Sequence, residues 1–297
     1  MNKRCGFISL TGRPNVGKST LLNSLLGKKI SITSEKPQTT RHRILGIKTT
    51  EHTQYLYVDT PGLHQGGKNQ MNRIMNRAAS RTVSDVDIVV FVVDANRWSN
   101  EDEMVVEKVC HNEFPVIVAL NKIDDFKKKD DLLLIMDKIA TKLPNVSIIP
   151  VSALKGEGIA DLERAIDQLL PESEFYFPKD QTTDRSDRFL ASEIIREKLM
   201  RDLADEVPYQ IAVEIEKFKE EKRVLHIAGL IWVEREGQKA IIIGKKGERL
   251  KRLGQQARED MARLFGQKIY LQLWVKVRSG WSDDIRALHS LGYKEDE

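Results

Sequence analysis

The chain of 297 residues is longer than one ordinary hydrophobic core accommodates, and this length is typical of two domains. Hydrophobic residues make up 40% and charged residues 31%, and the longest apolar run, 88–93, is far shorter than the roughly 20 residues that span a bilayer. The net charge of +4 is too small to indicate a polyanionic partner by itself. We therefore expect a cytoplasmic globular protein, and in the absence of an interface pattern we expect a monomer.

Short apolar runs alternate with helical patterns up to about residue 170. The runs expected to form strands are residues 7–10, 55–58, 88–93, 116–120 and 147–151. Consecutive apolar residues, as in 88–93, are typical of strands buried on both faces of a mostly parallel sheet. A further run, 44–48, is close enough to 55–58 to form an antiparallel hairpin at one edge. The pattern predicts an α/β domain over residues 1–170.

The composition changes beyond residue 170. Pro171 ends a helical pattern, and residues 178–184 are polar and turn-forming, so we expect a linker over 171–185. After the linker, the patterns predict the order helix, strand, strand, helix, helix, strand. Residues 186–297 are therefore expected to form a smaller α+β domain.

The segment 12–19 reads GRPNVGKS, which matches the pattern G-x-x-x-x-G-K-[ST] between a predicted strand and a predicted helix. Its glycines let backbone N–H groups surround phosphates, and the helix that follows adds the positive end of its dipole. In such a loop Lys18 can reach the β- and γ-phosphates, and Ser19 can offer its hydroxyl to Mg²⁺. The motif predicts the nucleoside triphosphate site of a P-loop NTPase.

Three further motifs follow predicted strands in the order expected of a guanine-nucleotide site. DTPG begins with Asp59, which can hold the Mg²⁺ shell, and ends with Gly62, whose N–H can sense the γ-phosphate. NKID ends with Asp124, which can accept hydrogen bonds from both N1–H and the 2-amino group of guanine. Adenine lacks this donor pair and would leave the carboxylate unpaired. The motif SALK at 152–155 can offer a backbone contact to the guanine oxygen, so we predict that the nucleotide is GTP or GDP.

Between the first two motifs, residues 38–41 read QTTR within a basic loop. A threonine hydroxyl here can complete Mg²⁺ coordination only while the γ-phosphate is present, which would make the loop a switch. We favour Thr40 over Thr39 for this role. The alternative is a pair of polar loop residues that bind no ligand.

The motifs give three sets of predicted site residues. The nucleotide contacts are Gly12, Arg13, Pro14, Asn15, Val16, Gly17, Lys18, Ser19, Thr20, Asp59, Thr60, Pro61, Gly62, Asn121, Lys122, Ile123, Asp124, Ser152 and Ala153. The catalytic residues are Lys18, Asn15, Thr40 and Gly62. The ligands of Mg²⁺ are Ser19, Thr40 and Asp59.

The residue after Gly62 is Leu63, where many GTPases have the glutamine that orients the attacking water. Leucine cannot do this, and His64 is expected to be a solvated loop residue rather than a base. Hydrolysis should therefore be slow until another group positions water or neutralises charge. Asn15 is a candidate, because its side chain can help to hold K⁺ beside the phosphates. The alternative is that Asn15 only shapes the loop.

Residues 244–247 read GKKG and follow an apolar run, with the apolar Leu250 three positions after the loop. This is the helix–GxxG–helix arrangement of a KH domain, whose loop clamps about four nucleotides of single-stranded RNA. From Lys239 to Arg278 the chain has eleven Lys and Arg against three Asp and Glu, as expected of a nucleic-acid site; the alternative is a solvated basic helix face. The predicted RNA contacts are Gly244, Lys245, Lys246, Gly247, Arg249 and Lys251.

Three aromatic residues of the second domain, Trp232, Tyr270 and Trp274, lie in predicted strands. We expect them to belong to the core of that domain. The alternative is that they stack on bases.

Taken together, the motifs resemble those of the Era family of bacterial ribosome-assembly GTPases over essentially the whole chain. The matching segments read GRPNVGKSTLLN, QTTRHR, DTPGL, NKID, VSALKGEG, EVPYQIAVEIEKF, IIIGKKGERLK and GWSDDIRALHSLGY. The resemblance implies a G domain of the Era/TrmE type followed by a type II KH domain. The hydrophobic Leu63 is also similar to the pattern of that family.

The resemblance implies a GTPase that converts GTP to GDP and phosphate with Mg²⁺. It further implies a KH domain that binds the single-stranded 3′ end of 16S rRNA in the GTP state, on the 30S ribosomal subunit, and releases it after hydrolysis. Peripheral association with the inner membrane is implied as well. The alternative function is an RNA chaperone with a structural nucleotide site, which Leu63 keeps open, whereas a tRNA-directed GTPase would need a different appended domain.

Overall fold

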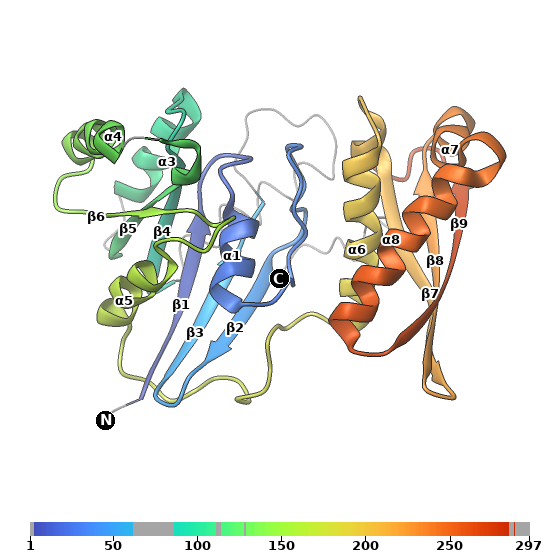
Figure 1. Cartoon of the computed structure of the whole chain (residues 1–297), viewed down its shortest axis with the longest axis horizontal. Coiled ribbons are helices and arrows are strands. Elements are labelled where there is room, and N and C mark those ends of the chain that lie inside the picture. Colours follow the sequence, from blue (N-terminus) through green and yellow to red (C-terminus); the bar gives the residue numbers. More distant parts are fainter. Residues whose placement is uncertain (1–2, 62–85, 111–113, 128, 285–287, 289–297) are drawn as a thin grey trace. The chain divides into compact units, whose positions relative to one another are not determined.

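The computed structural model describes residues 3–61, 86–110, 114–127, 129–284 and 288 (Figure 1). Its contacts divide the chain into two units. The first unit contains the described residues up to Asp184 except 34–39, and the second contains residues 34–39 and those from Arg185 onward. Each unit has a hydrophobic core of its own.

The first unit is built on a sheet with the strand order β2-β3-β1-β4-β5-β6. The strands are β1 (Arg4–Thr11), β2 (Ile44–Thr49), β3 (Thr53–Asp59), β4 (Ile88–Asp94), β5 (Val116–Asn121) and β6 (Ser147–Val151). β2 and β3 pair antiparallel at one edge, and all other neighbours pair parallel. Every residue of β4 is buried, as expected of an inner strand covered on both faces. The predicted α/β class and the edge hairpin are confirmed.

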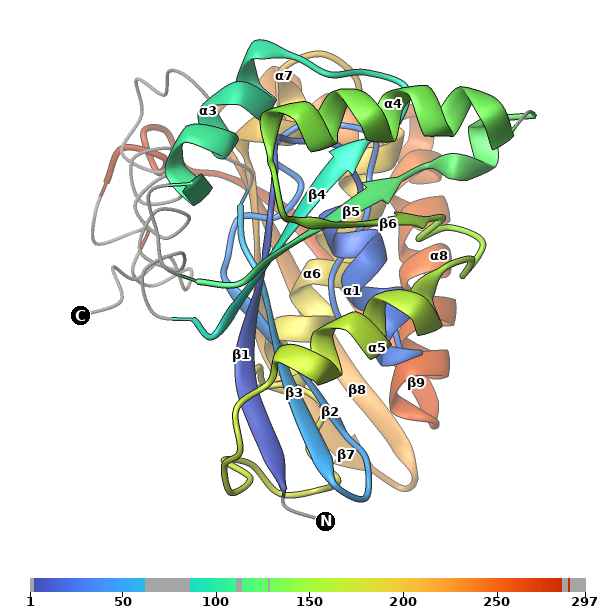
Figure 2. The same cartoon turned by 90° about the vertical axis from the view of Figure 1, so that its left-hand side faces the viewer.

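The helices of the first unit pack against this sheet (Figure 2). They are α1 (Lys18–Leu26), α3 (Asn100–Cys110), α4 (Lys129–Lys142) and α5 (Ile159–Leu169), with a short 3₁₀ helix, η1 (Ile123–Asp125). α3 and α4 bury Val105 and Ile139 in one cluster with β4 and β5, and Leu143, directly after α4, belongs to the same cluster, while α1 and α5 lie side by side. Parallel strands place their carboxyl ends along one edge of the sheet, so the loops after β1, β3, β5 and β6 meet there.

Residues 171–184, most of the predicted linker, are held against the first unit. The buried side chain of Gln54 accepts hydrogen bonds at Oε1 from the N–H groups of Tyr176 and Phe177, at 2.9 and 3.0 Å. The N–H of Ile47 donates to the carbonyl of Thr182 at 2.9 Å. This polar segment therefore forms hydrogen bonds along β2 and β3 instead of being an unattached linker.

The second unit is a three-stranded sheet with α6 and α8 on one face (Figure 1). Its elements are α6 (Asp187–Asp202), η2 (Val207–Gln210), β7 (Ile211–Glu221), β8 (Val224–Val233), α7 (Glu236–Ile243), η3 (Lys245–Gly247), α8 (Glu248–Phe265) and β9 (Lys268–Val277). β8 pairs antiparallel with β7 and parallel with β9. This order confirms the predicted α+β domain. No helix in the described parts of the chain is both long enough and apolar enough to cross a membrane.

The core of the second unit follows from the spacing of apolar residues on α8. Leu253, Ala257 and Met261 are spaced four residues apart, so they share one face of the helix, and all three are buried. Ile227 and Ile231 of β8 belong to the same cluster. The helices therefore cover one face of the sheet, with aliphatic side chains on both sides of the contact.

The expectation that Tyr270 and Trp274 belong to the core is wrong. Side chains alternate along a strand, and the odd-numbered residues of β9 face the helices, so these two residues point to the opposite face. Their exposed fractions are 49% and 44%. Trp232 is half-buried, and its Nε1 donates to Oε2 of Glu214 at 2.9 Å.

Candidate functional site

The loop between β1 and α1 has the tight backbone that its glycines predict. A side chain on Gly12 would meet the carbonyl oxygen of Val92 at 2.4 Å, and one on Gly17 would meet Nδ2 of Asn121 at 2.2 Å. Gly17 begins α1 without a side-chain cap, so the first N–H groups of the helix are left for an anionic ligand. The geometry is that of a phosphate-binding loop.

Lys18 is buried inside this loop. Its Nζ donates to the carbonyl oxygens of Gly12 and Arg13, at 2.9 and 2.8 Å. Burial lowers the pKa of the ammonium group to about 8, although the negative charge of Asp59 acts in the opposite direction. A phosphate in the loop would favour the charged form of Lys18.

The three predicted Mg²⁺ ligands lie together. Ser19 Oγ is 2.7 Å from Thr40 Oγ1 and donates to Oδ2 of Asp59 at 2.7 Å. Ser31, which sequence reasoning missed because it belongs to no motif, donates to the same carboxylate oxygen at 2.9 Å. Burial raises the pKa of Asp59, and the hydrogen bonds from these serines together with the charge of Lys18 act against that rise.

This arrangement fits a hard divalent cation. The second carboxylate oxygen of Asp59, Oδ1, is buried and has no hydrogen-bond partner among the described residues. Hydroxyl and carboxylate oxygens are the ligands that Mg²⁺ prefers. Of the two threonine candidates, Thr40 contacts Ser19, whereas the hydroxyl of Thr39 donates to the carbonyl of Lys36 at 2.6 Å. The geometry therefore favours Thr40.

Asn121 joins the phosphate loop to the predicted guanine-binding segments. Its Nδ2 donates to the carbonyl of Val16 at 2.7 Å, and its Oδ1 accepts from the N–H of Ala153 at 2.9 Å. Ser152 Oγ donates to Oδ1 of Asp124 at 2.6 Å, which orients the carboxylate predicted to read guanine. One buried amide thus assembles the loops after β1, β5 and β6 into a single site.

Arg13 and Lys122 share a carboxylate that sequence reasoning missed. Asp94 Oδ2, at the end of β4, lies 2.6 Å from Lys122 Nζ and 3.7 Å from Arg13 Nη2. Arg13 Nε also donates to Oδ2 of the buried Asp102 at 3.0 Å, and this oxygen accepts from the N–H of Ser99. Burial raises the pKa of Asp94, but hydrogen bonds, chiefly from Lys122, outweigh it and hold the pKa below its ordinary value. Asp94 ends the buried strand β4 in the same way as Asp59 of the DTPG motif ends β3. A search for acidic residues at the carboxyl ends of predicted strands would therefore have identified Asp94.

The remaining predicted residues can be placed only in part. Gly62, Leu63 and His64 lie outside the described residues. Asn15 is exposed in the phosphate loop, with a positive φ of 64°. Thr60 is buried directly after β3, and its hydroxyl lies 3.5 Å from the carbonyl of Leu10.

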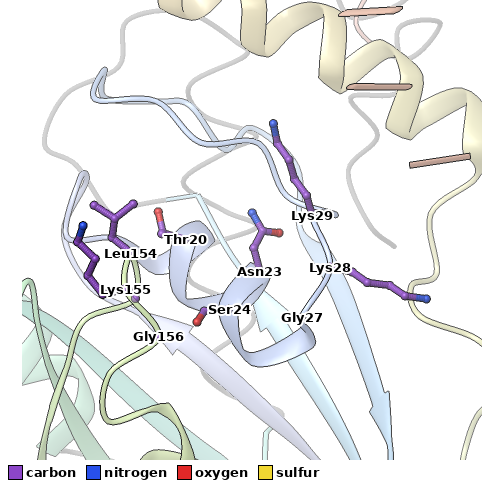
Figure 3. A pocket seen from close by; sticks show the side chains of 10 residues that line it. Thr20, Asn23, Ser24, Gly27, Lys28, Lys29, Leu154, Lys155 and Gly156 are labelled. Atoms are coloured by element: carbon purple, nitrogen blue, oxygen red, sulfur yellow. The ribbon is translucent and has the colours of Figure 1, made fainter. Parts of the chain in front are cut away.

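A hollow of about 390 Å³ lies between α1 and the loop after β6 (Figure 3). Thr20 and Ala153, two predicted nucleotide contacts, line it. Lys155 and Lys28 lie at its two ends. The predicted base site is therefore bordered by an open and basic surface.

In the second unit, the GKKG loop makes a left-handed turn between α7 and α8. A side chain at Gly244 would meet Cβ of Arg249 at 2.7 Å, and Lys246 and Gly247 have φ values of 51° and 80°. Lys245 and Lys246 are exposed. The loop thus offers bare backbone beside two cationic side chains, as RNA-phosphate recognition requires.

Arg249, a predicted RNA contact, forms a hydrogen bond and an ion pair within the second unit. Its Nη1 donates to the carbonyl of Ile241 at 2.8 Å, and its Nε lies 3.3 Å from Oδ2 of Asp202. These contacts link the start of α8 to α7 and to the end of α6. The guanidinium therefore stabilises the loop, whereas Lys251 is exposed.

A groove of about 370 Å³ extends from the GKKG loop between α8 and β9. Its walls combine basic and apolar side chains, from Gly247, Leu250, Lys251, Gly254, Gln255, Arg258, Leu271 and Leu273. Sequence reasoning identified only the loop end of this groove, because its floor comes from a strand that is distant in sequence. A basic wall and an apolar floor suit the backbone and the bases of a single strand.

Comparisons with known proteins match parts of both units to known domain families. Residues 7–122 match the family described as 50S ribosome-binding GTPase, and residues 206–282 match the KH domain family. The chain is 58% identical to GTPase Era of Ectopseudomonas mendocina, over 98% of this chain and 97% of that protein. It is 57% identical to GTPase Era of Azotobacter vinelandii, again over 98% and 97%.

Two solved structures are similar over nearly the whole chain. One is Era in complex with MgGDPNP and nucleotides 1506–1542 of 16S ribosomal RNA, with a TM-score of 0.94, 41% identity, and coverage of 98% of this chain and 99% of that one. The other is a variant of Aquifex aeolicus Era bound to GDP·AlF4⁻, with the same TM-score, identity and coverage.

We predict that the affinity for GDP falls as the pH rises above about 8. The pKa of Lys18 in the free protein is about 8, so Lys18 is charged below that pH and increasingly neutral above it. Phosphate favours the charged form, so binding at higher pH must take up a proton, and the affinity falls by up to about tenfold per pH unit.

Calorimetric titration of GDP between about pH 7 and about pH 9, in two buffers of different ionisation enthalpy, measures affinity and proton uptake together. The variant Lys155→Ala removes a neighbouring exposed lysine and should keep the proton uptake. A constant affinity without proton uptake would show that Lys18 is not the group that titrates.

Proposed function

The chain belongs to the Era family of GTPases, and from that premise we propose that it is a switch that binds the 3′ end of 16S rRNA while GTP is bound and assists assembly of the 30S subunit. The observation that carries the proposal is the contact of Thr40, a loop residue, with Ser19 at 2.7 Å. A loop hydroxyl at the metal ligands responds to the presence of the γ-phosphate, which is how GTPase switch loops are ordered.

Five of the predicted site residues have a definite role in this proposal. When bound, Mg²⁺ neutralises charge on the phosphates. Lys18 and the N–H groups at the start of α1 hold the phosphates, while Ser19, Thr40 and Asp59 hold the cation. Asp124 accepts the guanine donors in the orientation set by its hydrogen bond from a serine hydroxyl.

The RNA partner is inferred from the GKKG groove and from the related Era that was solved with 16S rRNA. The G-domain family is described as 50S ribosome-binding GTPase, so rRNA of the large subunit is the main alternative partner. A cytoplasmic monomer with peripheral contact to the inner membrane stays a prediction that rests on the resemblance. The domain boundaries 1–170 and 186–297 likewise stay predictions.

We predict that RNA carrying the 16S 3′ end accelerates single-turnover hydrolysis of GTP. The alternative, an RNA chaperone with a structural nucleotide site, predicts no acceleration.

Replacing both Lys245 and Lys246 with Ala should weaken RNA binding and reduce its salt slope by about 0.7 per lost phosphate contact. Single-turnover assays and salt-dependent anisotropy measure the two effects.

The matched control replaces Lys217 and Lys219 with Ala, because both are exposed but lie within 3.4 Å of Glu221. RNA of the same length from the large ribosomal subunit tests whether that subunit is the partner instead. Hydrolysis that is equal with and without 16S RNA, or faster with large-subunit RNA, would contradict the proposal.

We further propose that K⁺ takes part in hydrolysis through Asn15, which is exposed in the phosphate loop. Single-turnover rates should then be higher in K⁺ than in Na⁺, and Asn15→Ala should abolish the difference while GDP affinity changes little. Equal rates in the two salts for the original protein would exclude this role.

A further inference from the structure

β9 carries two different rows of side chains on its two faces. The row that faces the helices is aliphatic and consists of Ile269, Leu271, Leu273, Val275 and Val277. The opposite row, called here the β9 row, is cationic, aromatic or amide in every position and consists of Lys268, Tyr270, Gln272, Trp274 and Lys276. This contrast follows from the alternation of side chains along a strand.

The two aromatic rings of the β9 row lie beside neighbouring side chains of the sheet and still expose nearly half of their surface. The ring of His226 lies beside that of Tyr270, with centroids 5.2 Å apart. Leu230 is opposite Trp274 in the strand register and is buried. Large exposed aromatic surface on an otherwise polar face is typical of an interaction site.

The composition of the row favours a nucleic acid strand over a protein. Proteins that bind single-stranded nucleic acids stack bases on aromatic rings and place cations beside the phosphates. Gln272 adds an amide that can donate to and accept from a base edge. On β7, Glu221 lies 3.4 Å from Lys217 and from Lys219, whereas Glu216 lies 3.8 Å from Lys276, so one of the two cations of the β9 row is paired with an acid of β7.

The β9 row is also continuous with the proposed RNA groove. Leu271 and Leu273, on the other face of the same strand, line that groove, and β9 is the edge strand of the sheet. A GxxG loop clamps about four nucleotides, and the proposed rRNA 3′ end extends beyond them. We propose that the β9 row stacks the bases of single-stranded RNA that continues from the GKKG groove over the edge of the sheet. This inference rests on the proposed function.

The experiment compares two labelled RNAs with the 16S 3′-terminal sequence, one of about six nucleotides that fills the groove and one of about fourteen. In the variant Tyr270→Ala/Trp274→Ala, affinity for the longer RNA should fall by about tenfold or more, the cost of losing stacked rings, while affinity for the shorter RNA stays unchanged. Fluorescence anisotropy measures both. Tyr176→Ala, which truncates a 62% exposed aromatic residue of the first unit, is the matched control and should change neither.

A spectroscopic test uses Trp274 itself. The longer RNA should quench tryptophan fluorescence more than the shorter RNA does, and Trp274→Phe should lose this extra quenching while it keeps most of the affinity. Equal affinity of the double variant and the original protein for the longer RNA would overturn this inference alone. A change of oligomeric state in the double variant with no change in RNA binding would assign the face to self-association and overturn it too. If the original protein binds neither RNA, the proposed function fails and this inference with it.

Discussion

The nucleotide site depends on one buried amide. Asn121 hydrogen-bonds the carbonyl of Val16 and the N–H of Ala153, so the phosphate loop and the guanine-binding loops are held by the same side chain. The close approach that this requires also explains Gly17, since any side chain there would occupy the position of the amide. Asp94 adds a second tie between the same loops through Arg13 and Lys122. The parallel sheet supplies the common edge, and these buried polar contacts fix the loops on it.

The second unit depends on a different constraint, the coverage of one sheet face by helices. α6 and α8 bury the aliphatic row of β9, so the groove beside the GKKG loop has an apolar floor. The opposite face is left to the β9 row. The same alternation therefore produces both the groove and the exposed aromatic residues, and a single strand contributes to two surfaces.

Local patterns predicted the fold class, the edge hairpin and the residues of the phosphate loop, because each depends on neighbours in sequence. Ser31 and Asp102 were missed because their roles arise from contacts between segments that are distant in sequence, whereas Asp94 had a readable signal, its place at the end of a buried strand. The assignment of Trp274 to the core failed for a related reason. A strand pattern gives the alternation of side chains but does not say which face the helices cover.

The most direct test of this account is the affinity of Asn121→Ala for GDP and for IDP, which lacks the 2-amino group. If Asn121 acts by holding the loops together, both affinities should fall by about tenfold or more, because two buried hydrogen-bonding groups lose their partner, and their ratio should be kept. The control Gln255→Ala removes an exposed amide of the second unit, which donates to Glu259, and should change neither. Unchanged affinities, or a loss confined to GDP, would contradict the account.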